Sequence, residues 1–419
     1  MSFFIIKGQE SLKGEISVGG AKNSALKIIP AAVLCQGPVT ISNLPDVEDV
    51  KRSLEVFTSL GGKINTDHKT SLHLPKISRH DIDPELANKF RASIMFAGPL
   101  LARTGEAIFP HPGGCVIGAG TRPIDIFLDS YKKLGAEITL KNNLYYLKAK
   151  KLRGASYFFT TISVTGTESI MMTATLAEGI TTLQNCAMEP EIIELAQFLN
   201  KAGAKISGAG TPTITIKGVK KLNGGHFNVI PDRIETGTFA ILSAAARSPL
   251  TINNCHPNHI ESLLTIFSKL GIGYTTGKDY LKITTFPKKL KAYNLKTHEY
   301  PGFPTDLQSP FTVLMTQAEG SSLIHETIYD RRLLFTDMLT QMGANITMCD
   351  PHRVVVQGPT PLHGRSLTSP DLRAGISMII AGIIAKGTTK IDNIYQIERG
   401  YEHIESRLKK IGVNITRAE

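Results

Sequence analysis

The chain has 419 residues, which is several times the size of a typical single domain, so we expect more than one hydrophobic core. Its five cysteines are widely separated and include no C-x-x-C pair, which argues against a disulfide framework and a zinc site, and we expect neither metal nor cofactor. The net charge of +11 is not gathered in a Lys/Arg run and Trp is absent, which argues against a nucleic-acid partner. A positively charged cleft for a small polyanion, such as a phosphate ester or nucleotide sugar, explains this charge better.

The beginning of the chain predicts a strand at Phe3–Lys7 and no secretory signal, because Met1–Ile6 has no basic start and no small-residue cleavage site. The longest apolar stretch, Ile376–Ala385, is interrupted by Ser and Gly and is closed by Lys386, so we expect no membrane span. A cytoplasmic enzyme fits these features best.

A repeat then runs along the chain. At intervals of roughly seventy residues, an Ala-rich helical pattern closes on a small residue and is followed by a Thr/Ile strand. The closing residues are Gly37, Gly105, Gly179, Ser248, Gly320 and Gly387. A second marker has the same phase, where an amphipathic helical pattern ends before a β-branched run, at Gly61, Gly135, Gly203, Gly271, Gly343 and Gly412. The chain is therefore interpreted as six copies of one supersecondary unit.

Each copy begins with a helix that is small or apolar on most sides, as in Ala21–Leu34 and Asp371–Ile384, and is therefore expected to be buried. A strand ending in Asn follows in four copies, at Val39–Asn43, Thr181–Asn185, Leu250–Asn254 and Thr388–Asn393. A helix with a one-sided apolar stripe and two more strands complete a β-α-β-α-β-β unit. Six units divide most simply as three plus three, with the seam near Asn228–Asp232 and the first strand free to join either half.

Polar residues gather at the starts of the buried helices, where unpaired N–H groups favour an anion. They are Lys22, Asn23, Arg91, Thr165 to Glu168, Asp232, Arg233, Glu235, Asp306, Asp371 and Arg373. Asp232 and Thr167 are expected to be ordinary helix caps. Lys22, Arg91 and Arg373 are better candidates for a site, because a cation at this end opposes the helix dipole and requires a compensating negative group.

The segment Pro110–Pro123 is rich in glycine, which predicts a loop that changes shape over a ligand. Cys115 lies on this loop with cations nearby, so its thiolate is a candidate for reactivity. The other cysteines are expected to be buried and inert, with Cys35 inside a helix, Cys349 near a turn, and Cys186 and Cys255 at equivalent packing positions of two repeats.

Seven segments spread over almost the whole chain together resemble the enolpyruvyl transferase family, and within it the UDP-N-acetylglucosamine 1-carboxyvinyltransferases. They are Gly20–Ser24, Arg91–Ser93, Pro112–Gly118, Pro231–Gly237, Phe303–Asp306, Asp371–Arg373 and Arg399–Glu402. The resemblance implies an α+β inverse prism of two similar domains, each of three repeats around buried helices, with the active site between them. It places residues 22–229 in one domain with the Cys115 loop, and residues 1–21 plus 230–419 in the other.

The resemblance also implies the reaction: the 3′-hydroxyl of UDP-N-acetylglucosamine adds to C2 of phosphoenolpyruvate and phosphate is lost, the first committed step of peptidoglycan precursor synthesis. Cys115 then matches the acid and Asp306 the general base. Residues matching phosphoenolpyruvate contacts are Lys22, Asn23, Arg122, Arg332, Arg373 and Arg399. Residues matching the UDP-sugar side are Arg91, Arg122, Ser163, Val164, Thr165, Asp306 and Ile328. Fosfomycin, an epoxide phosphonate that mimics phosphoenolpyruvate, is expected to alkylate Cys115.

Two departures from the family pattern accompany this match. The Gly118–Arg122 loop is about two residues longer than the shorter family loop, and Thr161 stands where some members have a lysine near the diphosphate. Transfer to another hydroxyl, such as that of shikimate 3-phosphate, is the alternative enzyme, although that branch does not use the cysteine loop. A noncatalytic basic repeat protein is the alternative of another class, and the net charge of +11 is its only support.

Overall fold

The structure is a computed structural model that describes residues 2–8, 11–66, 69–113 and 124–419. The chain forms two compact units. The N-unit comprises residues 20–113 and 124–230, and the C-unit comprises residues 2–8, 11–19 and 231–419. Each unit has its own apolar core, and none of the described residues belongs to both cores.

The N-unit surrounds its inner helices with three sheets. The inner helices are α1 (Lys22–Ala32), α4 (Ala97–Thr104) and α6 (Val164–Ala174), and the outer ones are α2 (Glu48–Ser59), α5 (Asp125–Lys133) and α7 (Pro190–Lys201), with the short α3 (Pro84–Lys89) before a 3-10 turn at Arg91–Phe96. One sheet has the order β13 (Gly225–Asn228), β3 (Val39–Ser42), β5 (Thr70–His73), β4 (Lys63–Asn65). The second is β11 (Lys205–Ser207), β12 (Thr213–Lys217), β10 (Ile180–Gln184), β9 (Ser156–Phe158), and the third is β6 (Glu106–Pro110), β8 (Leu144–Lys148), β7 (Glu137–Lys141).

The C-unit repeats this plan. Its inner helices are α8 (Arg233–Ala245), α10 (Gln308–Met315) and α12 (Leu372–Ile384), and the others are α9 (Glu261–Lys269), α11 (Thr336–Gln341), α13 (Tyr395–Glu398) and α14 (Ile404–Lys410). One sheet has the order β15 (Gly273–Thr276), β16 (Tyr280–Thr285), β14 (Leu250–Asn253), β2 (Glu15–Ser17). The second is β17 (Leu295–Lys296), β18 (Gly320–His325), β20 (Arg353–Gly358), β19 (Asn345–Asp350), and the third is β21 (Ser366–Thr368), β22 (Thr388–Asp392), β1 (Phe3–Lys7), β23 (Asn414–Ala418).

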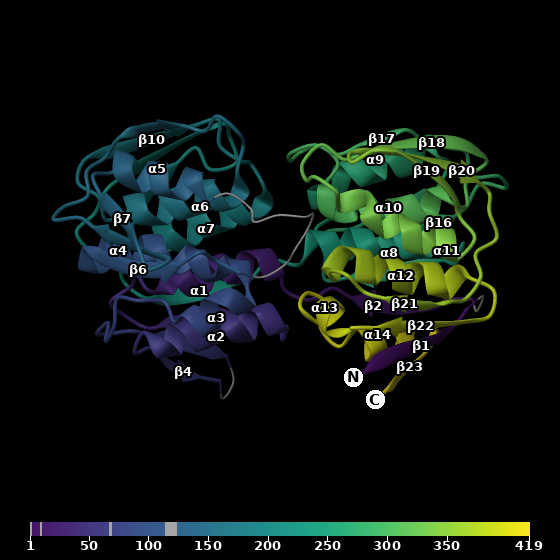
Figure 1. The fold of residues 1–419 in the computed structure, drawn as a ribbon, viewed down its shortest axis with the longest axis horizontal. Helices are drawn as coiled ribbons and strands as arrows, with labels where there is room; N and C mark the ends of the chain where they lie inside the picture. The colour runs from purple at the N-terminus through teal and green to yellow at the C-terminus, as the bar shows by residue number, and fades with distance from the viewer. Residues whose placement is uncertain (1, 9–10, 67–68, 114–123) are drawn as a thin grey trace. The chain divides into compact units, whose positions relative to one another are not determined.

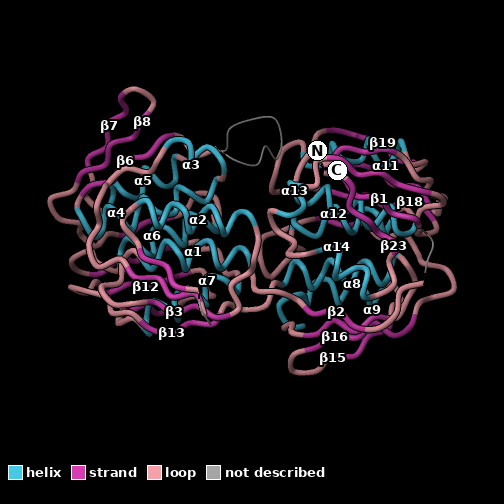
Figure 2. The backbone as a smooth tube through the Cα atoms, turned by 90° about the horizontal axis from the view of Figure 1, so that it is seen from below, coloured by secondary structure: helices cyan, strands magenta, loops and turns pink. Residues whose placement is uncertain are grey.

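The inner helices are buried because they lack a polar stripe. In α12 every residue except Ile384 is buried, and α10 is buried throughout. Helices α8, α10 and α12 lie against one another, with the strands outside them (Figures 1 and 2). The predicted α+β architecture of two similar three-repeat domains around buried helices is confirmed. Within the described ranges, no helix is both long and apolar enough to cross a lipid bilayer.

The N-terminal segment completes two sheets of the C-unit. Strand β1 lies between β22 and β23 and is antiparallel to both, while β2 pairs with β14 in parallel. Figure 1 shows this first strand beside the last strands of the chain. In the sixth repeat, β1 takes the place between the first and last strands that β5, β8, β12, β16 and β20 take in the other repeats, where this strand comes from the repeat's own sequence. The start of the chain thus closes the ring of three repeats within this unit.

Four repeats close in the same way at the Asn that ends their first strand. Asn43, Asn185, Asn254 and Asn393 have φ between 54° and 57°, the left-handed conformation that Asn tolerates. Each side-chain amide donates to the carbonyl of the residue that follows the parallel neighbouring strand, at 2.6 to 2.8 Å. The acceptors are Val229, Phe159, Val18 and Ser369, respectively. The strand-ending Asn is thus a structural element of the repeat.

The second sequence marker has a backbone cause. All six of its glycines follow an outer helix with φ between 73° and 111°, a conformation that strains any side chain.

We expect Gly135→Ala to lower the free energy of unfolding by about 1–2 kcal/mol, because the nearest atom to the new Cβ, the Lys151 carbonyl oxygen, is 3.6 Å away and the cost is the backbone strain alone. Urea unfolding checks this against Gly225→Ala, where the new Cβ meets nothing within 4 Å and φ is not left-handed. Equal losses in the two variants would contradict it.

Candidate active site

Asp306 lies between two arginines in the C-unit. It belongs to the 3-10 turn Thr305–Leu307 that leads into α10, Arg332 opens the 3-10 turn Arg332–Phe335 that precedes α11, and Arg373 is the second residue of α12. Arg332 Nη2 donates to Asp306 Oδ1 at 2.7 Å, and Arg373 Nη2 donates to Oδ2 at 2.7 Å. Three of the residues predicted for the site are therefore joined by direct hydrogen bonds.

Both arginines are buried, with 6% of each residue exposed. Burial by itself lowers the pKa of a guanidinium, yet the neighbouring Asp306 carboxylate raises the pKa of both Arg332 and Arg373 above the ordinary value. Arg373 also donates to the Tyr401 hydroxyl at 3.2 Å, and burial raises the pKa of that tyrosine to about 12. Two fixed, charged guanidinium groups thus face one carboxylate. Such an arrangement suits the recognition of a carboxylate or a phosphate.

Two more predicted residues of the C-unit lie on neighbouring segments. Ile328 is partly exposed in the turn after β18, where its N–H donates to Glu326 Oε1 at 2.9 Å. Arg399 is buried at the end of α13 and donates to Gln396 Oε1 at 3.2 Å.

In the N-unit, the predicted residues that the structure describes lie at or just before the starts of inner helices and are partly exposed. Lys22 begins α1 and its Nζ is 3.2 Å from Asp49 Oδ2 on α2, so this helix-start cation has a carboxylate partner as expected. Asn23 follows Lys22 in α1, and Arg91 begins the turn that leads into α4. Ser163, Val164 and Thr165 form the start of α6. Lys27 in α1 pairs with Glu168 in α6 at 3.3 Å, and each lies in the second turn of its helix, so these two helix starts share one end of the unit.

This buried pair is one feature that the sequence analysis missed. Glu168 is 0% exposed and burial raises its pKa to about 8, an effect that Lys27 opposes. Glu194 on α7 is also buried, accepts hydrogen bonds from Ser24 Oγ and the Ile230 N–H, and has its pKa raised to about 7, again mainly by burial. The sequence placed Glu168 among the polar residues at the start of a buried helix, but it gave no signal that Lys27 is its partner.

We expect Glu168→Gln to remove part of the pH dependence of stability. Between about pH 4.5 and 8 the native state holds the Glu168 proton and the unfolded chain does not, so this carboxyl reduces stability as the pH rises through that window. The wild type should therefore lose stability relative to Glu168→Gln between pH 5 and pH 8, by up to about 1.4 kcal/mol for each pH unit. Urea unfolding at both values measures this. Glu178→Gln, whose side chain is 56% exposed, is the control and should follow the wild type. Parallel curves for wild type and Glu168→Gln would refute the expectation.

The two capping predictions had different outcomes. Asp232 caps α8, since its Oδ1 accepts from the Ile234 and Glu235 N–H groups. The prediction for Thr167 is wrong: Ser163 is the N-cap of α6, and Thr167 lies inside the helix, where its hydroxyl accepts from the Ala187 N–H at 3.2 Å. The apolar pattern located the helix but not its first turn.

Cys115, Arg122 and the Gly118–Arg122 loop lie outside the described residues. Of the described cysteines, Cys186 and Cys255 are buried as predicted. Cys35 is buried too, but it follows α1 instead of lying within it. Cys349 departs from the prediction, because it is exposed on β19.

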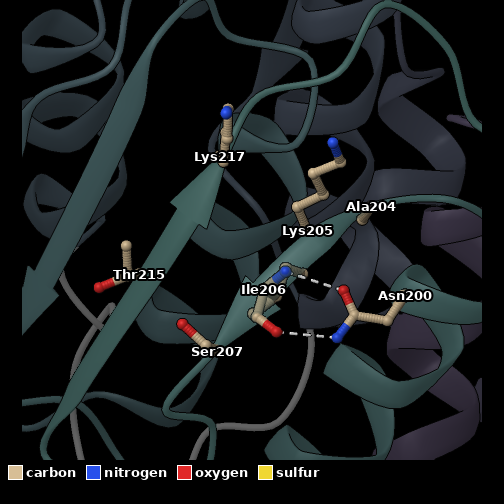
Figure 3. A pocket seen from close by; sticks show the side chains of 7 residues that line it. All are labelled: Asn200, Ala204, Lys205, Ile206, Ser207, Thr215 and Lys217. Atoms are coloured by element: carbon tan, nitrogen blue, oxygen red, sulfur yellow. Dashed lines mark hydrogen bonds between the residues drawn. The ribbon is translucent and has the colours of Figure 1, made fainter.

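A pocket of about 410 Å³ in the N-unit contains none of the predicted site residues. Figure 3 shows its lining, which includes Asn200 on α7, Ile206 on β11, and the lysines Lys205 and Lys217. The Asn200 side chain is already used, because it donates to the Ile206 carbonyl and accepts from the Ile206 N–H. Without a buried polar group aimed into it, this pocket has no feature of a catalytic site.

The family model for EPSP synthase (3-phosphoshikimate 1-carboxyvinyltransferase) matches residues 6–408. UDP-N-acetylglucosamine 1-carboxyvinyltransferase from Treponema denticola is 45% identical over 427 aligned residues, covering 99% of each chain. The chain belongs to this family of carboxyvinyltransferases. The UDP-N-acetylglucosamine 1-carboxyvinyltransferase from Koribacter versatilis is 42% identical and covers 100% of this chain and 96% of that protein.

Solved carboxyvinyltransferase structures share the fold. The enolpyruvyl transferase NikO from Streptomyces tendae superimposes with a TM-score of 0.89 at 22% identity, covering 100% of this chain and 99% of that one. EPSP synthase from Acinetobacter baumannii gives 0.75 at 17% identity, with 100% of both chains covered. At these identities the likeness concerns the architecture alone.

Proposed function

We propose that this protein transfers the enolpyruvyl group of phosphoenolpyruvate to the 3′-hydroxyl of UDP-N-acetylglucosamine and releases phosphate. The observation that carries the proposal is full-length identity of 45% and 42% to relatives named for this reaction. The cluster of Asp306, Arg332 and Arg373 supports the proposal, because it contains one carboxylate and two guanidinium groups. The reaction needs a base for the hydroxyl and cations for a carboxylate and a phosphate.

The proposed roles follow the chemistry of each side chain. Cys115 protonates C3 of phosphoenolpyruvate, and Asp306 removes the proton of the 3′-hydroxyl as the oxygen attacks C2. The cationic or polar residues proposed to hold phosphoenolpyruvate are Lys22, Asn23, Arg122, Arg332, Arg373 and Arg399. The residues proposed to contact the nucleotide sugar are Arg91, Arg122, Ser163, Val164, Thr165, Asp306 and Ile328. Phosphate then leaves and the C3 proton is lost, which restores a carbon–carbon double bond.

The hydrogen bonds of Asp306 add a condition to this mechanism. Both of its oxygens accept from guanidinium groups, which weakens a carboxylate as a base. The carboxylate of phosphoenolpyruvate is an equivalent acceptor for the same two guanidinium groups. Substrate binding that draws Arg332 or Arg373 toward the substrate carboxylate would free an Asp306 oxygen for the hydroxyl proton, so that the base becomes active when its substrate is present.

Shikimate 3-phosphate is the alternative acceptor, since the matching family model bears the name of that enzyme. The Pro112–Gly118 motif with Cys115 favours UDP-N-acetylglucosamine, because the shikimate branch does not use the cysteine loop. With UDP-N-acetylglucosamine as the acceptor, the protein would act in the cytoplasm at the start of peptidoglycan precursor synthesis, and so in cell-wall formation, cell shape and division.

Phosphate release from phosphoenolpyruvate tests the proposal, with UDP-N-acetylglucosamine and shikimate 3-phosphate offered in parallel. We expect phosphate and an enolpyruvyl ether of UDP-N-acetylglucosamine. Turnover with shikimate 3-phosphate alone would transfer the assignment to the alternative, and salt-dependent RNA binding without phosphate release would favour the noncatalytic protein.

A further inference from the structure

Glu326 departs from the pattern of its repeat. In four repeats, a left-handed Asn follows the first strand and its amide closes the repeat, but the residue that follows β18 is Glu326, which does not have a positive φ. It is also buried, with 0% of the residue exposed. A buried carboxylate in place of a structural amide requires a reason of its own.

The structural task of the missing Asn is carried out by the next residue. The Thr327 hydroxyl donates to the Thr297 carbonyl at 2.7 Å, and Thr297 follows the parallel strand β17 as Val18 follows β2. The Thr327 N–H also donates to Thr297 Oγ1 at 2.9 Å. The repeat therefore closes without Glu326.

Glu326 instead connects two segments of the candidate site. Its Oε2 accepts from the Thr305 hydroxyl at 2.8 Å, and Thr305 is the neighbour of Asp306. Its Oε1 accepts from the N–H groups of Ile328 at 2.9 Å and Tyr329 at 3.2 Å. One carboxylate thus fixes both the segment of the proposed base and the segment of Ile328.

The connection has a direction. A hydroxyl has one proton, so Thr305, which donates to Glu326, must accept from Arg332 Nη1 at 2.7 Å. The other end of that guanidinium donates to Asp306. The charges also balance, because Asp306 pairs with the buried Arg332 and Arg373, and the Glu326 carboxylate adds a second negative charge near Arg332. Without the Glu326 charge, these four side chains would have one positive charge in excess.

We propose that Glu326 is a positioning residue of the active site: it orients Thr305 and Arg332, and through them Asp306, while it holds the Ile328 turn in place. This inference rests on the proposed function for its kinetic consequences but not for its structural ones. Since Glu326 acts through other residues, its removal should alter both the chemical step and acceptor binding.

The test is Glu326→Gln, which keeps the shape and removes the charge and one acceptor. We expect kcat to fall by about tenfold to a hundredfold, the size expected for a lost hydrogen bond to a charged group, and KM for UDP-N-acetylglucosamine to rise. In a Thr305→Val background, the same change should lower kcat much less, because the link to Arg332 is already absent. Asn254→Gly is the matched control: Asn254 has the position of Glu326 in another repeat, where its side chain does close the repeat, and glycine permits the positive φ, so this change should lower Tm without changing kcat or KM.

Two kinetic outcomes would overturn the inference: wild-type kcat and KM in Glu326→Gln, or fully additive losses with Thr305→Val. A crystal structure of Glu326→Gln separates this inference from the proposed function, since the Thr305 and Arg332 side chains should reorient whichever acceptor the enzyme uses. Unchanged side chains would refute the positioning role even if transfer to UDP-N-acetylglucosamine were established. An inactive wild type with a reoriented Glu326→Gln structure would instead refute the function and keep the role.

Discussion

Replacing Cys115 by alanine should reduce turnover by about a hundredfold to ten-thousandfold, the contribution typical of a general acid. Cys115→Asp should retain part of the activity, because a carboxylic acid can still deliver a proton to C3 of phosphoenolpyruvate. Steady-state phosphate release with phosphoenolpyruvate and UDP-N-acetylglucosamine measures both variants. A fully active Cys115→Ala enzyme would refute the assigned role.

The other cysteines supply the controls for this prediction. Burial raises the pKa of Cys35 and Cys186 to about 12 and that of Cys255 to about 11, so these thiols should stay unreactive near neutral pH. Cys349 is exposed on β19 and is the relevant competitor for an alkylating agent. Peptide mapping after fosfomycin treatment should place the adduct on Cys115, and Cys349→Ala should keep wild-type turnover. An adduct on Cys349 with Cys115 unmodified would contradict the proposed chemistry.

The repeat could be predicted from the sequence because its markers are local. The glycines after the outer helices and the Asn after the first strands each satisfy a left-handed backbone position, and such positions select the residue type directly. Burial of the inner helices could also be predicted locally, because a helix without a polar stripe has to be covered on most sides. The helix start that was misplaced, at Thr167 instead of Ser163, lies where several polar residues in succession are able to cap.

The connections within the site could not be predicted in this way. A cation at the start of α12 indicated that Arg373 needs a negative partner, but that partner, Asp306, is 67 residues away along the chain. Glu326 illustrates the same limit, since its place in the repeat predicts a structural turn and only the folded chain shows the carboxylate contacting Thr305. The local sequence thus indicates which groups need compensation, and the packing of the repeats within a unit determines which groups provide it.

Asp306→Asn should have the second large effect, because it removes the proposed base and also breaks the ion-pair cluster. An amide offers only one oxygen, so one of the two guanidiniums that now donate at 2.7 Å would face an NH2 group. We expect kcat to fall by about a hundredfold or more. The free energy of unfolding should decrease by about 3 kcal/mol, since two buried arginines lose a charged partner. Asp350→Asn, which breaks an Asp–Arg pair at the surface, should change both quantities little.

Phosphoenolpyruvate separates the two effects of Asp306→Asn. If Arg332 and Arg373 bind its carboxylate, the substrate anion can take the place of the lost Asp306 oxygen, and added phosphoenolpyruvate should raise the Tm of Asp306→Asn more than that of the wild type. Catalysis should stay low at saturating phosphoenolpyruvate, because the restored ion pairs do not restore a base. An equal Tm shift in both proteins would mean that these arginines do not bind the substrate carboxylate, and recovery of kcat at saturation would mean that Asp306 serves binding and not proton transfer.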